Sequence, residues 1–212
     1  MVFAGAPLEP TQRLRARIAA LNQPRVIAAD SGAATALAFG LRPDVVVGDF
    51  DSLTATVRET LQMQGVPFER YPVAKDATDG QLALHYAVQQ QPTDILLMGY
   101  LNGARLDMTL SGVLLLVDTA VPTVLVDERN EALLLRGPRR HTWAPEPQEL
   151  VSLLPLTGDC AGVRTEGLRF PLHGEGLILG DTRGVSNEPR AAHVSVALEQ
   201  GALLLCRHFA RL

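Results

Sequence analysis

Apolar residues follow two different patterns along the chain, and the pattern changes near residue 131. Before that point, short runs rich in β-branched residues alternate with stretches of helical spacing. This alternation is typical of a parallel sheet whose strands are joined by crossover helices. The predicted strands lie at residues 2–4, 25–29, 45–47, 68–71, 95–98 and 123–126. The predicted helices lie at residues 9–21, 33–39, 54–64, 78–90 and 106–117.

After Glu131 the apolar runs become shorter and are separated by Gly and Pro, as in antiparallel strands of a small sandwich. These runs lie at residues 133–135, 150–154, 162–165, 177–179, 193–197 and 202–206. The proline-rich segment 136–147 is the predicted seam between the two halves. We therefore predict an α/β domain at residues 1–135, with a mostly parallel sheet and flanking helices. An all-β sandwich domain is predicted at residues 136–212.

Composition narrows the range of partners. The 212 residues are 47% apolar, enough for a substantial core, and the formal net charge is −4. A chain with this charge has no overall basic field, which argues against nucleic acid and anionic membranes as partners. The sequence shows no secretory signal and no apolar run of membrane-spanning length, so we expect a cytoplasmic protein.

Acidic residues follow the predicted strand at 45–47. Asp49 and Asp51 are two positions apart, and alternate side chains of an extended segment point the same way, so the two carboxylates are expected to converge. Ligands of open α/β sheets bind outside the carboxyl ends of the strands. Two close carboxylates repel unless a cation lies between them, and Mg²⁺ prefers such oxygen ligands together with substrate phosphates. The alternative is that Asp51 or Ser52 only caps the next helix.

Three further polar loops follow the predicted strands at residues 25–29, 68–71 and 95–98. Backbone N–H groups at a helix start and the guanidinium of Arg105 both suit phosphate oxygens. For two of these loops the alternatives are a helix cap at Thr78 or Asp79 and a structural Arg105–Asp107 ion pair. The candidate nucleotide-binding residues are Asp30, Ser31, Gly32, Lys75, Asp76, Thr78, Gly103, Arg105 and Asp107.

The order of these motifs resembles the thiamin pyrophosphokinase family, also called thiamine diphosphokinase. The motifs are AADSGAA, GDFDSL, KDATDGQLAL, GARLD, LLPL, TEGL and GVSNE, and the resemblance extends from about residue 26 to the C-terminus. It implies a nucleotide-binding α/β domain joined to a thiamine-binding β-sandwich, in a homodimer with active sites between subunits. The implied reaction transfers the pyrophosphoryl group of ATP, the co-substrate, to the hydroxyl of thiamine, giving thiamine diphosphate and AMP.

The resemblance also implies roles for single residues. Asp49, Asp51 and Asp79 correspond to the catalytic Mg²⁺ ligands. Ser186 and Asn187 lie on the segment that faces thiamine, although a tight polar turn would explain them as well.

Two positions depart from the family pattern. Met108 stands where His is usual, and Gly112 stands where Asn is usual. These departures leave open a non-catalytic homologue that binds nucleotide or thiamine. Some relatives stack an aromatic side chain on thiamine a few residues after SNE, whereas Arg190 is nearby here, and pyrophosphoryl transfer to a different alcohol is also left open. A phosphatase using DFDSL as a nucleophile loop is a further alternative, but it leaves GVSNE unexplained.

Overall fold

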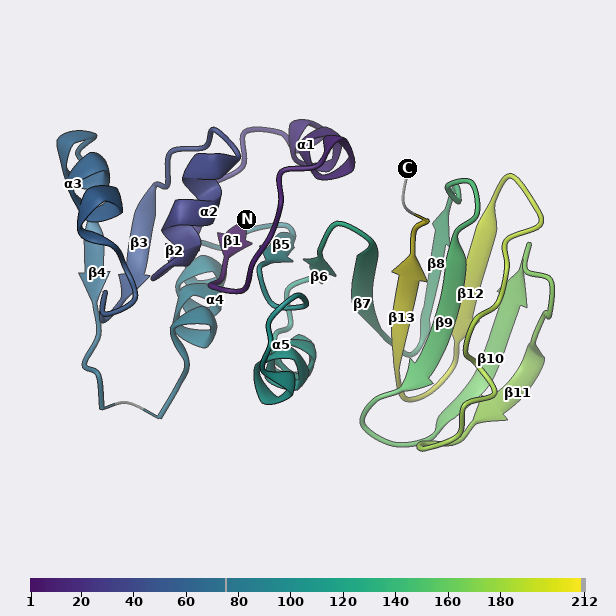
Figure 1. Ribbon diagram of the computed structural model, residues 1–212. Coiled ribbons are helices and arrows are strands. Elements are labelled where there is room, and N and C mark those ends of the chain that lie inside the picture. Colours follow the sequence, from purple (N-terminus) through teal and green to yellow (C-terminus); the bar gives the residue numbers. More distant parts are fainter. Residues whose placement is uncertain (75, 211–212) are drawn as a thin grey trace. The chain divides into compact units, whose positions relative to one another are not determined.

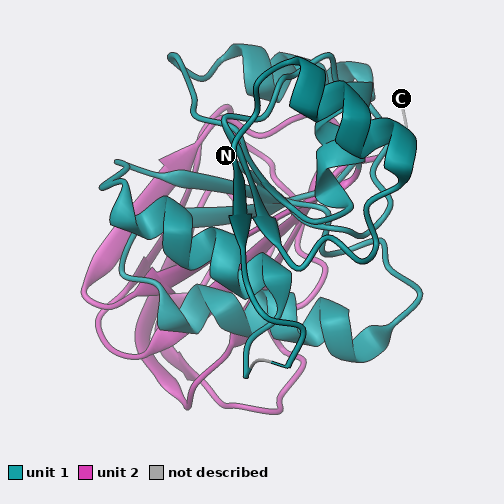
Figure 2. Cartoon of the chain, turned by 90° about the vertical axis from the view of Figure 1, so that its left-hand side faces the viewer, with its two compact units in different colours: residues 1–128 teal, residues 129–212 magenta. Residues whose placement is uncertain are grey.

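The protein is described by a computed structural model covering residues 1–74 and 76–210 (Figure 1). The chain divides into two compact units, Met1–Glu128 and Arg129–Leu212 (Figure 2). The division follows residue 128 rather than residue 135, because strand β7 (Asn130–Arg136) pairs with β13 (Ala202–His208) inside the second unit. Among the described residues, no helix combines the length and apolar character that a membrane crossing requires.

The first unit contains six parallel strands in the order β4-β3-β2-β1-β5-β6. Strands β1, β2, β3 and β5 are buried along their whole length, as expected for the centre of a parallel sheet, whereas the edge strand β4 is half-buried to exposed. The strands are β1 (Val2–Phe3), β2 (Ile27–Ala29), β3 (Val45–Gly48), β4 (Phe68–Arg70), β5 (Ile95–Met98) and β6 (Thr123–Val126). All six lie where the sequence predicts strands.

Helices cover both faces of this sheet (Figure 1). The helices are α1 (Gln12–Ala19), α2 (Gly32–Ala38), α3 (Ala55–Met63), α4 (Asp79–Gln89) and α5 (Leu106–Asp118). Leu14 of α1 and Ala36 of α2 share a core with Phe3, while Leu61 of α3 shares another with Val46. Helices α4 and α5 lie on the opposite face (Figure 1).

The chain reverses its direction across the sheet at β1, which pairs with β2 on one side and β5 on the other. It first runs outward from β1 to β4 and then returns to β5 and β6. Such a reversal opens a crevice at the carboxyl ends of the strands, the usual ligand position in open α/β sheets. The fold therefore places the loops after β1, β2, β3 and β5 at one edge.

The second unit consists of antiparallel strands. Strands β7, β13 and β9 (Leu150–Pro155) pair in that order, and a separate four-stranded sheet has the order β11-β10-β12-β8. The latter strands are β8 (Arg139–Trp143), β10 (Cys160–Glu166), β11 (His173–Leu177) and β12 (Val194–Leu198). Buried residues from both groups, including Leu153, Val163 and Leu203, form one core.

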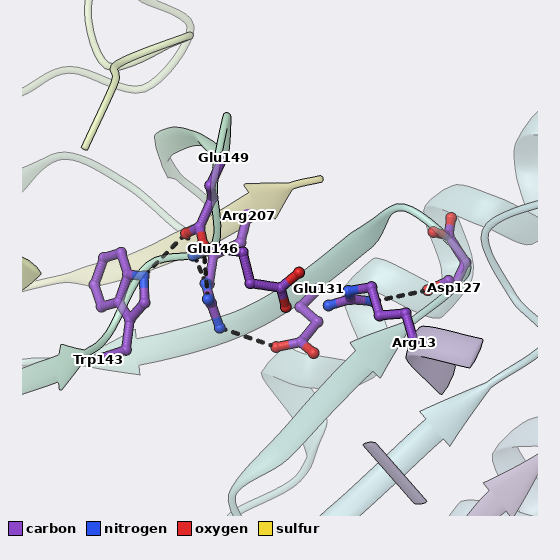
Figure 3. Close-up of polar contacts among 7 residues, drawn as sticks. All are labelled: Arg13, Asp127, Glu131, Trp143, Glu146, Glu149 and Arg207. Atoms are coloured by element: carbon purple, nitrogen blue, oxygen red, sulfur yellow. Dashed lines mark hydrogen bonds and ion pairs between the residues drawn. The ribbon is translucent and has the colours of Figure 1, made fainter. Parts of the chain in front are cut away.

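A buried polar network lies beside that core (Figure 3). The indole of Trp143 donates to the Glu149 carboxylate at 2.9 Å, and the Arg207 guanidinium donates to the same carboxylate at 2.8 Å. Arg207 also pairs with Glu131 at 3.2 Å. Because Glu149 is 2% exposed, these bonds supply the partners that a buried carboxylate needs. Trp143 is thus a structural residue.

Strand β8 is the element that the sequence pattern hides. It lies within the segment predicted as a seam, and its residues RRHTW have only one buried position, Trp143. A strand whose other side chains are polar gives no apolar alternation for sequence analysis to detect.

Candidate functional site

Three carboxylates meet at the carboxyl edge of the parallel sheet. Asp30 follows β2, Asp49 follows β3, and Asp79 is the first residue of α4. Each contributes one oxygen atom to a group whose members all lie within 4.8 Å of one another. Three close negative charges repel one another, so the arrangement favours a bound cation. Oxygen ligands of this kind suit hard divalent cations such as Mg²⁺.

Asp30 is the most deeply placed of the three, at 6% exposure. One carboxylate oxygen, Oδ2, accepts a hydrogen bond from the Ser52 hydroxyl at 2.6 Å. The other, Oδ1, is buried with no hydrogen-bond partner among the described residues. Burial raises the pKa of Asp30; the hydrogen bonds from Ser52 oppose the shift, and the charges of Asp79 and Asp49 add to it. A buried carboxylate with one oxygen unpartnered among the described residues, next to two other carboxylates, fits a cation site.

Gly48 allows this close approach. Its φ of 148° lies outside the range that other residues readily adopt. A Cβ atom at this position would lie 2.9 Å from Asp79 Oδ1 and 3.3 Å from Asp30 Cβ. The glycine that ends β3 is therefore required for the carboxylates to share one space.

Asp51 does not belong to the group of three. Its side chain is exposed, and its backbone N–H donates to Asp49 Oδ1 at 3.2 Å. The expected convergence of Asp49 and Asp51 assumed an extended segment, but Phe50 between them has a left-handed φ of 68°. Phe50 is held there by burial against Phe68, and its carbonyl accepts from Arg58 at 2.6 Å. The structure thus joins Asp30, rather than Asp51, to Asp49 and Asp79.

The start of α4 positions Asp79. Thr78 is the N-cap, and its hydroxyl accepts from the Gln81 N–H at 3.2 Å. The capping alternative is therefore observed for Thr78, and the cap fixes the residue that follows it. The positive end of the helix dipole also favours a carboxylate in this first turn. Asp76 is exposed on the preceding loop, and the predicted residue Lys75 lies outside the described residues.

Tyr100 is a site residue that the sequence did not suggest. It follows Gly99 at the end of β5, is 4% exposed, and its hydroxyl has no hydrogen bond among the described residues. Burial raises the pKa of Tyr100; the Thr78 side chain opposes the shift, and the Asp79 charge adds to it. An aromatic residue directly after a buried strand was the available signal. Sequence analysis assigned roles in this loop only to Gly103, Arg105 and Asp107.

The other predicted nucleotide residues are arranged around the same edge. Gly32 starts α2 so close to β1 that a Cβ atom would lie 2.2 Å from the Phe3 carbonyl oxygen. Ser31 is the N-cap of this helix without a capping side-chain bond. Arg105 and Asp107 pair with each other through two hydrogen bonds and are both exposed. The predicted alternative of an ion pair is thus formed, and nothing within 3.4 Å restricts Gly103.

Ser186 and Asn187 lie in the second unit. The Asn187 side chain bonds the backbone of Phe170 twice, accepting from its N–H at 3.1 Å and donating to its carbonyl at 2.7 Å. Its own backbone pairs with Val151. The amide therefore joins two chain segments, as a polar turn residue does. Ser186 has a left-handed φ of 60° and an exposed side chain.

Comparison with known proteins gives this arrangement a context. Residues 18–125 match the family described as thiamin pyrophosphokinase, catalytic domain. The chain belongs to the thiamin pyrophosphokinase family. Residues 140–203 match the vitamin B1 binding domain of the same family. The two matches confirm the predicted family and enzyme type.

Individual relatives agree with this assignment. The thiamine pyrophosphokinase of Bacillus subtilis strain 168 is 29% identical over 184 residues, covering 85% of this chain and 86% of the relative. A crystal structure of thiamine pyrophosphokinase from Bacillus subtilis has a TM-score of 0.88 at 27% identity, covering 99% of this chain and 98% of that one. The thiamin pyrophosphokinase structure from Geobacillus thermodenitrificans has a TM-score of 0.85 at 29% identity, covering 99% and 96%.

Proposed function

We propose that the protein transfers the pyrophosphoryl group of ATP to the hydroxyl of thiamine, and that the carboxylate group of Asp30, Asp49 and Asp79 is the centre of this reaction. The observation that carries the proposal is the meeting of three carboxylates at the carboxyl edge of a family-typical sheet. Repulsion among the three negative charges opposes folding, and a bound cation would offset it. A pyrophosphotransferase requires such a site for its polyphosphate substrate.

The donor set fits Mg²⁺. The three residues offer oxygen atoms only, and Asp30 Oδ1 is buried without a hydrogen-bond partner among the described residues. When bound, Mg²⁺ would supply positive charge to the phosphate oxygens and so favour attack on the β-phosphorus. Asp30, Asp49 and Asp79 would hold it, and Asp51 stays a predicted ligand in the same loop.

The chain's own groups would position the substrates. The N–H groups in the first turn of α4 lie next to Asp79 and suit phosphate oxygens. Arg105 and its partner Asp107 are both exposed, so exchanging Asp107 for a phosphate would cost little. Positioning and charge stabilisation are the main tasks of the protein in phosphoryl transfer.

Thiamine would be bound with the help of the second unit, whose residues 140–203 match the vitamin B1 binding domain. Asn187 fixes the adjacent segment through its two bonds to Phe170, while Ser186 leaves its hydroxyl exposed to solvent. We assign Asn187 to shaping this surface and Ser186 to contacting thiamine. The two antiparallel sheets of this unit, which share one core, would form the predicted β-sandwich.

We further propose the predicted homodimer. Four apolar side chains recur along α5 at intervals of one helical turn and are exposed: Leu106 at 72%, Leu110 at 54%, Leu114 at 56% and Val117 at 36%. An apolar helical stripe of this kind is typical of a surface that another protein covers. The cytoplasmic location stays a prediction.

The test is a reaction with ATP and Mg²⁺, with and without thiamine, in which AMP and thiamine diphosphate are both measured. We expect both products only when thiamine is present. AMP formation with another alcohol, but not with thiamine, would move the assignment to a different acceptor. A folded protein that binds nucleotide and forms no AMP would identify a non-catalytic homologue.

The ligand set is tested in the same assay with Asp30→Asn, Asp51→Asn and Asp79→Asn. We expect Asp30→Asn and Asp79→Asn to lower turnover by at least about 100-fold, the scale seen when a key electrostatic group is removed. We expect a smaller loss for Asp51→Asn. Asp118→Asn, which changes an exposed carboxylate at the far end of α5, is the control. Equal losses for Asp30→Asn and Asp51→Asn would place Asp51 among the ligands.

A further inference from the structure

The surroundings of Tyr100 fit its aromatic ring but leave its hydroxyl without a hydrogen-bond partner among the described residues. The side chain is 4% exposed, and the residue follows Gly99 directly after the end of β5. Its ring packs against α5 and its hydroxyl reaches α4, as the contacts below show. The hydroxyl oxygen is buried and makes no hydrogen bond with the described residues.

Two glycines make the space for this side chain. A Cβ atom at Gly112 of α5 would lie 2.4 Å from Tyr100 Cδ1 and 2.8 Å from Cγ. A Cβ atom at Gly80 of α4 would lie 1.9 Å from the Tyr100 hydroxyl oxygen. Both distances are too short for any side chain, so the two helices accept Tyr100 only because they carry glycine at these positions. Gly112 is one of the two departures from the family pattern, and Tyr100 accounts for it.

Gly80 also locates the hydroxyl relative to the carboxylate group. It directly follows Asp79, so the Tyr100 hydroxyl lies beside the first turn of α4 from which Asp79 projects. The Asp79 charge is close enough to act on Tyr100. Thr78, the other polar neighbour, lies close enough to lower the pKa of Tyr100 by hydrogen bonding, but no hydrogen bond to the Tyr100 hydroxyl forms with the geometry of the described residues.

A buried hydroxyl without a partner costs free energy that phenylalanine, of the same shape, would avoid. The hydroxyl therefore calls for a partner that forms under working conditions. We propose that Tyr100 is a positioning residue whose hydroxyl donates a hydrogen bond to the Asp79 carboxylate when the carboxylate group holds its divalent cation. The inference rests on the cation site of the proposed function. A carboxylate that gives one oxygen to a cation can accept such a bond with its lone pairs on the other oxygen, and the bond fixes its orientation.

The experiment measures cation binding directly, by titrating the full-length protein with Mn²⁺ and following the signal of free Mn²⁺ by electron paramagnetic resonance. For Tyr100→Phe we expect Mn²⁺ to bind about 10- to 100-fold more weakly, the usual effect of losing a residue that orients a metal ligand. In EDTA we expect the thermal midpoint of Tyr100→Phe to equal or exceed that of the unchanged protein, because an unpartnered hydroxyl is removed. Tyr86→Phe, on the same helix as Asp79, is the matched control and should change neither quantity.

The possible outcomes distinguish a failure of the Tyr100 role from a failure of the cation site itself. Tight Mn²⁺ binding by the unchanged protein that is lost in Asp79→Asn, with unaltered binding in Tyr100→Phe, would overturn the role of Tyr100 alone. A lower midpoint in EDTA with unaltered Mn²⁺ affinity would show that the hydroxyl has a structural partner, and would also overturn it. No Mn²⁺ binding by the unchanged protein would overturn the proposed cation site, and the inference with it.

Discussion

Asp30 is held in a left-handed backbone conformation, with φ of 46°, and its carboxyl group is buried beside two others. Both features cost stability in the absence of a ligand. The hydrogen bond from Ser52 offsets part of that cost. Such a combination at one residue is typical of functional sites, where stability is given up for a prepared binding geometry.

The Asp30→Asn variant should therefore be more stable than the unchanged protein at neutral pH in the absence of metal. The native pKa of Asp30 is raised, chiefly by burial, so its ionisation opposes folding once the pH exceeds that pKa. The gain from Asp30→Asn is expected to be full above the native pKa, to shrink as the pH falls through it, and to vanish below the ordinary Asp value of about 3.9. Urea unfolding in EDTA between pH 4 and 8 measures this. A difference that does not change over this range would contradict the argument.

Sequence analysis named two of the three clustered carboxylates, Asp49 and Asp79, as predicted Mg²⁺ ligands, and it placed Asp30 among the nucleotide contacts. It could not rank Asp30 against Asp51, because that ranking depends on the backbone of one residue. Phe50 adopts φ of 68° to bury its ring, and this turns the chain at the point where alternation was assumed. Such a conformation results from tertiary packing and leaves no mark in the residue pattern.

The contact between Tyr100 and Gly112 predicts that substitutions at these two positions affect stability jointly. Gly112→Asn restores the family's usual residue, but its Cβ would collide with the Tyr100 ring, so we expect a loss of about 1–3 kcal/mol in the free energy of unfolding. Tyr100→Ala alone should also destabilise, because it leaves a cavity. The double variant should lose less unfolding free energy than the sum of the two single losses. Tyr100→Ala removes the ring with which Asn would collide, and Gly112→Asn fills part of the cavity that Tyr100→Ala leaves. Purely additive losses in urea unfolding would contradict direct packing between these positions.

Among the elements, α4 shows how a helix start positions a functional side chain. The predicted range 78–90 and the observed Asp79–Gln89 agree closely because Thr78 gives a clear capping signal and the apolar spacing continues to Ala87. Strand β8 lacked both kinds of signal and was missed. Local chemistry is thus enough to place an element when its cap and its apolar face are both encoded nearby.

Removing the Thr78 cap should loosen the first turn of α4, and Asp79 with it. Thr78→Ala should cost about 1 kcal/mol of unfolding free energy and also weaken Mn²⁺ binding. Thr54→Ala is a close control, because Thr54 caps α3 in the same way, through the Val57 N–H at 3.4 Å. It should cost a similar free energy without changing Mn²⁺ affinity. Equal effects of both variants on Mn²⁺ affinity would show that the cap does not act through Asp79.

For the whole molecule, the sequence correctly indicated a parallel α/β part followed by antiparallel strands, because the period of the apolar pattern differs between them. The point of division was harder to predict. Strand β7 follows directly on the first unit, but its pairing with β13, more than 60 residues later in the chain, and the packing of Leu135 in the second unit's core assign it to the second unit. A pairing between strands so far apart in sequence cannot be read from the local pattern.

The exposed apolar stripe on α5 predicts how copies of the whole molecule associate. Leu110 and Leu114 project from consecutive turns and are 54% and 56% exposed, so a second copy of the chain that covers them would bury their side chains. The double variant Leu110→Glu and Leu114→Glu should place two charges in that interface and convert the proposed dimer to a monomer. Sedimentation velocity at micromolar concentration measures the change.

The matched control for that experiment is Met63→Glu, because Met63 is a single apolar residue on α3 that is 83% exposed. An isolated exposed side chain is normal on a monomer surface, so this variant should leave the dimer intact. Circular dichroism should show unchanged helix content in all variants, since both leucine positions are already open to solvent in one chain. If the α5 variant sediments like the unchanged protein, or if the unchanged protein is itself a monomer, the α5 stripe is not a dimer interface.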